Sequence, residues 1–217
     1  MSWIFALGRK RGEEGIAMTK TVDFIFDFGS PNAYLVHKVL PKIAERTGAR
    51  FNYIPCLLGG VFKSTGNQSP LQAYAKIPAK MDYERLEMQR FITEHQLSRF
   101  TFNPNFPVNT LMLMRGAVAV KLLGKMPAYC DIAFKAMWED GRKMDDPSVF
   151  AETFTAAGLD GDAILTQTQD PKVKAALAKN TADAVHRGVF GIPTFFVDDA
   201  MFFGKERLSQ LAQEIRK

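Results

Sequence analysis

The sequence predicts an α/β protein in which a β-α-β segment and a β-β-α segment are separated by a long block of helices. Three observations predict it. Runs rich in β-branched and aromatic residues fall near both ends of the 217-residue chain, helix start signals with proline recur along it, and the middle carries apolar residues at helical spacing. With 47% hydrophobic residues, the chain can bury one sizeable core.

The first segment is predicted to be a strand, a helix and a second strand. Residues 22–28 are rich in Val, Ile and Phe, which suits a mostly buried strand. Ser30 as N-cap and Pro31 at the first helical position predict the start of a helix, and Gly48 predicts its end. Residues 50–55 predict the next strand, which completes a β-α-β opening.

The middle of the chain, from residue 57 to about 181, predicts helices separated by proline and glycine. Asp146 and Asp170 each stand directly before a proline, which predicts that a helix begins there. The helix after Asp170 either runs on or breaks before Gly188. We interpret the whole block as a helical insertion.

The last segment predicts two short strands and a closing helix. Pro193 precedes an apolar strand that ends at Val197, and a second strand covers residues 201–203 after an Asp-Asp turn. The closing helix has one buried stripe at Leu208, Leu211 and Ile215.

This order of elements matches a thioredoxin-like fold whose middle connection has been expanded into a helical domain. We therefore expect a thioredoxin-like domain made of residues 20–60 and 183–217, and a helical insertion domain of residues 61–182. The first residues place their apolar part before their basic part, opposite to the order in a secretory signal. Residues 1–19 are predicted to be a disordered extension.

Composition argues against several classes of function. The net charge is +5, but no basic stripe interleaved with aromatic residues is visible, so no nucleic-acid partner is expected. No apolar stretch approaches the roughly 20 residues that a membrane span needs, and no membrane partner is expected.

The two cysteines predict buried, reduced thiols. Cys56 and Cys130 lie far apart and belong to no Cys-x-x-Cys or metal-ligand spacing, which fits a reducing cytoplasm. The three histidines, His37, His95 and His186, also show no metal spacing, and we interpret them as solvent-facing or locally satisfied. No metal site is predicted.

Four motifs give the chain a resemblance to a known family. They are Asp27–Tyr34 (DFGSPNAY), Leu58–Asn67 (LGGVFKSTGN), Gly188–Thr194 (GVFGIPT) and Phe203–Leu208 (FGKERL). In this order the chain resembles the glutathione-dependent 2-hydroxychromene-2-carboxylate isomerases and the kappa-class glutathione transferases, from about residue 20 to its C-terminus. The resemblance implies glutathione as the cofactor and a homodimer.

The resemblance gives Ser30 the catalytic role. The serine at this position of the family donates a hydrogen bond to the glutathione sulfur and favours the thiolate. The physics is sensible, because a free thiol has a pKa of about 8.5 and a helix N-terminus with a hydroxyl donor favours negative charge. From the Ser-Pro pair alone, an ordinary helix cap is the simpler interpretation.

The resemblance also implies the rest of the glutathione site. Pro193 corresponds to the cis-proline of thioredoxin-like proteins, which leaves the Ile192 backbone to pair with the cysteinyl part of glutathione. Asn67 and Lys76 are implied as further glutathione contacts, although the residues alone would suggest solvated loop positions.

Two positions depart from the family pattern. Lys205 and Glu206 stand where the family has a small polar residue followed by Asp, near the γ-glutamyl group of glutathione. Asn32 and Tyr34 are expected to line the substrate pocket, or else to be surface or packing residues of the first helical turn.

The leading functional hypothesis is isomerisation. Glutathione thiolate adds reversibly to the conjugated double bond of a benzylidenepyruvate-type substrate, which allows rotation before the sulfur leaves. The substrate is then a small aromatic carboxylate. The alternatives are a transferase that conjugates glutathione to electrophiles and a noncatalytic thioredoxin-like binding module. A disulfide oxidoreductase is disfavoured, since Ser30 and Ala33 occupy the places of the two redox cysteines.

Overall fold

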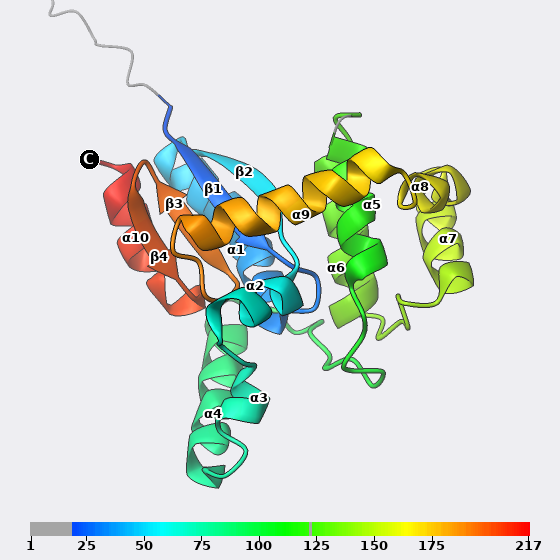
Figure 1. Cartoon of the computed structure of the whole chain (residues 1–217). Helices are drawn as coiled ribbons and strands as arrows, with labels where there is room; N and C mark the ends of the chain where they lie inside the picture. The colour runs from blue at the N-terminus through cyan, green and yellow to red at the C-terminus, as the bar shows by residue number, and fades with distance from the viewer. Residues whose placement is uncertain (1–18, 122) are drawn as a thin grey trace, which may run out of the picture.

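One four-stranded sheet lies at the centre of the protein, in a computed structural model that describes residues 19–121 and 123–217 (Figure 1). The strand order is β2-β1-β3-β4. β1 (Thr21–Phe26) is parallel to β2 (Arg50–Pro55) and antiparallel to β3 (Thr194–Val197), and β4 (Ala200–Phe203) is antiparallel to β3. The predicted thioredoxin-like arrangement is therefore present. The extension predicted for residues 1–19 lies outside the described residues, except for Thr19.

Helix α1 (Pro31–Thr47) begins and ends where the sequence predicts. The Ser30 side chain accepts a hydrogen bond from the backbone N–H of Ala33, and Pro31 occupies the first turn. Gly48 adopts φ 71°, and its N–H donates to Ala44 O at 2.8 Å. These local signals fix the Ser30 turn at the end of β1.

Helix α9 (Pro171–His186) runs without a break, which settles the alternative that the sequence left open. It crosses the sheet on the side that faces the viewer in Figure 1, with α1 behind the sheet and α10 (Leu208–Ile215) also packed against α1. The predicted boundary between residues 182 and 183 falls inside this helix.

Helices α2 to α8 lie between β2 and α9, in the segment predicted as an insertion except for the first three residues of α2. α3 and α4 form an arm that projects away from the sheet in Figure 1, and none of the residues of α4 is fully buried. α5 to α8 pack beside the sheet. The bounds are α2 Leu58–Thr65, α3 Pro70–Ala73, α4 Pro78–Glu94, α5 Leu111–Lys121, α6 Met126–Trp138, α7 Pro147–Ala156 and α8 Gly161–Gln167.

Aromatic rings join the sheet to the insertion in one core. The ring centroid of Phe28 lies 5.2 Å from that of Phe26 and 4.7 Å from that of Phe134 in α6. The core continues through Tyr129, which stacks on Phe154 of α7 at 4.4 Å. The segment that carries Ser30 is thus held between the sheet and the insertion. Within the described ranges, no helix has the length and apolar character of a bilayer-spanning segment.

Candidate active site

Ser30 forms two hydrogen bonds at the start of α1. Its Oγ accepts from the Ala33 N–H at 3.2 Å, and its hydroxyl donates to the Ile192 carbonyl at 3.2 Å. The residue is 4% exposed. The cap interpretation is therefore correct as far as it goes, but a cap uses only the oxygen as an acceptor. The hydroxyl proton is used in the second hydrogen bond, to the Ile192 carbonyl across the site.

The loop before β3 lies directly across from Ser30. The Ile192-Pro193 peptide bond is cis, as the resemblance implied. Pro193 O accepts from the Gly204 N–H at 2.9 Å, and the Thr194 hydroxyl donates to Gly191 O at 2.7 Å. No hydrogen bond among the described residues uses the Ile192 N–H. The fold thus brings Ser30, Ile192 and Pro193 together.

Asn67 reaches the same loop from the end of α2. Its Nδ2 donates to Phe190 O at 2.8 Å, and its Oδ1 accepts from the Gln68 N–H. Asn67 therefore contacts the loop at Phe190, two residues before Ile192. Lys76 is different: it is exposed between α3 and α4, and no side-chain hydrogen bond or ion pair of the described residues connects it to the site.

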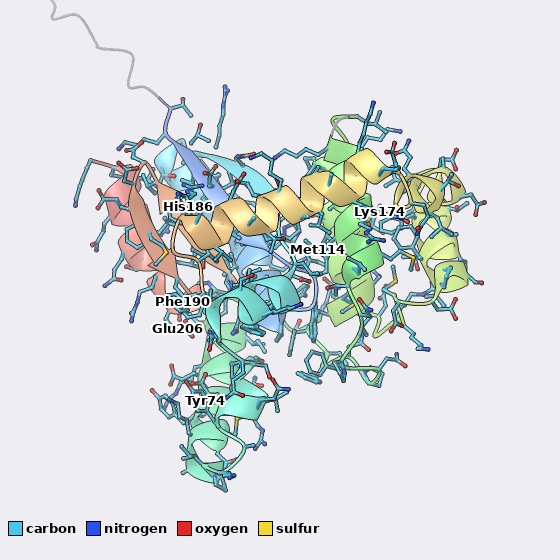
Figure 2. All side chains as sticks on the ribbon, in the orientation of Figure 1. Tyr74, Met114, Lys174, His186, Phe190 and Glu206 are labelled. Carbon is cyan, nitrogen blue, oxygen red and sulfur yellow. The ribbon has the colours of Figure 1, made fainter. Side chains whose placement is uncertain are left out.

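Lys205 and Glu206 lie in a short 3₁₀ turn (Lys205–Arg207) just before α10. The Lys205 side chain is buried, its ammonium group pairs with the Glu206 carboxylate, and it lies 5.9 Å from the Phe91 ring of α4. In Figure 2, Glu206 is labelled beside Phe190, near the point where the α3–α4 arm leaves the sheet.

Lys205 and Glu206 border a cavity of about 530 Å³ between α1, α4 and α10. Ser30 lines neither this cavity nor the second one, of about 360 Å³, beside α9. Because the Ser30 hydroxyl already donates to the Ile192 carbonyl, a sulfur atom that accepts a hydrogen bond from Ser30 has to replace that carbonyl as the acceptor.

Asn32 and Tyr34 have different environments. The Oδ1 atom of Asn32 is buried without a hydrogen-bond partner among the described residues. Tyr34 is 1% exposed, and its hydroxyl donates to Glu139 Oε1 at 3.1 Å. Burial and the neighbouring Glu139 carboxylate raise the pKa of Tyr34. Tyr34 thus takes the packing role that the sequence left open, whereas Asn32 retains an acceptor without a partner among the described residues, two positions after Ser30.

The cysteines take no part in the contacts of Ser30, and His37 is held by its own hydrogen bonds. Cys56 and Cys130 are both buried and unpaired, and burial raises the pKa of Cys56 to about 12. The His37 ring contacts Tyr53 Oη at 2.8 Å and Asp131 Oδ1 at 2.9 Å, which is the locally satisfied role. In the part of the chain that the structure describes, no three His, Cys, Asp or Glu side chains are grouped to hold a metal ion.

Sequence reasoning gave no role to Asp27, which the structure places under the Ser30 turn. Its carboxylate accepts hydrogen bonds from the Gly29 and Leu58 amides, each at 2.8 Å. The signal was present in the sequence: a carboxyl at the end of an otherwise apolar strand has to be satisfied when it is buried.

Comparison with known proteins places these features in a family. The model of the DSBA-like thioredoxin domain matches residues 21–216. A 2-hydroxychromene-2-carboxylate isomerase of Sphingobium xenophagum is 30% identical and is covered over 97% of its length by 89% of this chain. Glutathione S-transferase kappa 1 of Rattus norvegicus is 26% identical, with 89% of each chain covered.

A solved structure agrees with these relatives. The structure of a 2-hydroxychromene-2-carboxylate isomerase superposes with a TM-score of 0.78 at 29% identity, over 90% of this chain and 94% of that chain. A cytosolic disulfide reductase, DsbM from Pseudomonas aeruginosa with GSH, superposes with a TM-score of 0.58 at 15% identity and shows the fold alone.

Proposed function

Because the chain belongs to the DsbA-like thioredoxin family, in the branch of the 2-hydroxychromene-2-carboxylate isomerases, we propose that it is a glutathione-dependent isomerase. Its substrates are 2-hydroxychromene-2-carboxylate and trans-o-hydroxybenzylidenepyruvate, or a close analogue. The observation that carries the proposal is the Ser30 hydroxyl at the start of α1, across from the Ile192-Pro193 segment, with serine and alanine and no cysteine at positions 30 and 33.

The residues present fit glutathione. The unused Ile192 N–H suits a peptide that adds to the loop like a strand, and the Ser30 proton suits an anionic sulfur. Glutathione, when bound, supplies the nucleophilic sulfur that adds reversibly to the conjugated double bond. Asn67 holds the Phe190 carbonyl beside this position through its side-chain amide.

The role of the protein is to stabilise negative charge on one atom beside Ser30, which is buried. Ser30 donates a hydrogen bond to that charge while its oxygen remains the cap of α1, and the N-terminal end of α1 favours the same charge. The aromatic core behind Phe28 keeps the Ser30 turn in place. A hydroxyl that is already positioned needs no reorganisation when the charge forms.

Replacing Ser30 with Ala tests the proposal. We expect Ser30→Ala to lower glutathione-dependent turnover by about tenfold to a hundredfold, because the thiolate loses its hydroxyl donor. Glutathione binding, measured by calorimetry, should survive. The matched control is Ser69→Ala, which removes the equivalent cap of α3, where Ser69 Oγ accepts from the Gln72 N–H at 3.3 Å.

Both variants should lose about 0.5–2 kcal/mol of capping energy, so only a site-specific role separates them. Equal turnover in Ser30→Ala and wild type would contradict the proposed role of Ser30.

A second candidate function is conjugation of glutathione to an electrophile, which the similarity to kappa-class transferases favours. Incubation with glutathione and trans-o-hydroxybenzylidenepyruvate distinguishes the two. A reversible absorbance change without loss of glutathione supports the isomerase, and stoichiometric loss supports the transferase. A noncatalytic binding module predicts neither activity, and it predicts no glutathione-dependent thermal shift that Asn67→Ala or Lys76→Ala would remove.

A further inference from the structure

Asp27 is a buried carboxyl without a counter-ion. It follows the last residue of β1 and is 1% exposed. None of the ion pairs among the described residues includes it. Burial raises the pKa of Asp27, while hydrogen bonds from the Leu58 and Gly29 amides and from Thr110 act in the opposite direction. An isolated buried carboxyl is costly, so its contacts need an explanation.

The two oxygens of Asp27 bind two different segments of the site. Oδ1 accepts from the Gly29 N–H and Oδ2 from the Leu58 N–H, both at 2.8 Å. Gly29 directly precedes Ser30, whose own N–H donates to Asp27 O at 3.1 Å. Leu58 is the first residue of α2. A single side chain therefore connects the Ser30 turn to the first turn of α2.

The same connection extends to the far side of the site. α2 ends at Thr65, and Asn67 follows it, with its amide on the Phe190 carbonyl. Phe190 lies two residues before Ile192, whose carbonyl accepts the hydrogen bond from the Ser30 hydroxyl. The Ser30 turn, α2 and the cis-proline loop thus form a closed ring of contacts, in which Asp27 supplies the join between the first two.

The position of Asp27 needs a side chain that only accepts hydrogen bonds. Both partners of Asp27 are backbone N–H donors, and an ionised carboxylate offers acceptors on both oxygens. An asparagine has nearly the same shape, but its NH₂ group would face one of the two N–H groups and leave it unpaired. Asp27→Asn therefore breaks one join without opening a cavity.

On the basis of the proposed function, we propose that Asp27 is a positioning residue that holds the Ser30 turn and the first turn of α2 in the arrangement in which the Ser30 hydroxyl meets the sulfur of bound glutathione. Asp27 acts through Ser30 and α2, and it touches neither the tripeptide nor the substrate.

The test compares Asp27→Asn with Asp23→Asn. Asp23 lies on the same strand but pairs with Arg187 and Asn52, away from Ser30. The readout is the pKa of the thiol of bound glutathione, from the ultraviolet absorbance of the thiolate. We expect Asp27→Asn to raise that pKa by about one unit and to lower kcat by about tenfold, with KM changed less than about twofold. Asp23→Asn should leave all three unchanged.

The two proposals fail in different ways. If Ser30→Ala raises the thiol pKa and Asp27→Asn does not, the proposed function stands and the role of Asp27 is overturned. If the wild type binds no glutathione, the proposed function fails, and hydrogen exchange decides the positioning role. The Gly29 and Leu58 amides should then exchange at least about tenfold faster in Asp27→Asn, and unchanged exchange overturns it.

A second variant is available if Asp27→Asn does not fold. Thr110→Val removes the hydroxyl that contacts the Asp27 carboxyl and keeps the shape of the side chain. It should change the same readouts in the same direction by a smaller factor. No change in a folded Thr110→Val, together with an unfolded Asp27→Asn, would assign Asp27 to stability alone.

Discussion

At the scale of single residues, the Ser30 hydroxyl is both a helix cap and a hydrogen-bond donor. The sequence predicts the cap, because capping depends on neighbours within three positions. The donor role toward Ile192 depends on a residue 162 positions away, so only the fold can show it. The same limit explains Tyr34: the motif places it near the site, but packing against Glu139 is decided by the helical insertion.

The cysteines give a prediction at this scale. Burial raises the pKa of Cys56 to about 12 and also raises the pKa of Cys130, so neither thiol forms thiolate at neutral pH. Iodoacetamide should therefore modify neither residue in the folded protein and both residues in urea, as counted by mass spectrometry. Rapid alkylation of the folded protein would show an accessible thiolate and would reopen the oxidoreductase alternative.

At the scale of elements, the starts of helices were the most predictable feature. Asp146 and Asp170 precede proline and cap α7 and α9, each accepting from first-turn amides. The strands of both halves also follow from short apolar runs between turn residues. The direction of the α3–α4 arm has no such local cause, because α4 buries none of its residues completely.

A close approach between α5 and α6 makes an element-scale prediction. A Cβ on Gly116 of α5 would lie 2.2 Å from Tyr129 Oη, which is buried and donates to Leu113 O. Gly116→Ala should therefore destabilise the protein by about 1–3 kcal/mol in urea unfolding. Gly59→Ala in α2 is the matched control, because a Cβ there meets nothing within 4 Å.

Gly59→Ala should be neutral or stabilising by up to about 1 kcal/mol, since alanine is the better helix former. A neutral Gly116→Ala would mean that α5 and α6 are not packed as described.

At the scale of the whole molecule, the sheet and the helical insertion share one hydrophobic core. The order of elements could be predicted from periodicity and from proline and glycine positions. The shared core could not, because ring contacts such as Phe28 with Phe134 join distant segments. His37 was predicted to be solvent-facing or locally satisfied, and it is the second: it connects α1 to β2 and α6 through Tyr53 and Asp131.

This connection predicts a pH dependence of stability. The hydrogen bond with His37 lowers the pKa of Asp131 below its ordinary value of 3.8, against a smaller opposing effect of burial. The folded state then favours the carboxylate, so the contribution to stability is present above that value and is lost as the pH falls through the lowered pKa. It should be small, because the Asp131 side chain is 72% exposed.

Asp131→Asn should accordingly be less stable than wild type near neutral pH, and the difference should shrink in strong acid, as measured by urea unfolding. A difference that persists unchanged in strong acid would assign the effect to packing instead of charge.

The bond from the Ser30 hydroxyl to the Ile192 carbonyl has a consequence for selectivity. A sulfur atom that enters the site has to compete with the Ile192 carbonyl oxygen for the hydrogen bond that Ser30 donates. Thiols and thioethers are weak acceptors and lose that competition, whereas an ionised sulfur wins it. With glutathione as the proposed cofactor, the protein would discriminate between charge states of the same tripeptide, and with an S-alkylated analogue the Ser30 hydroxyl would keep its bond to Ile192.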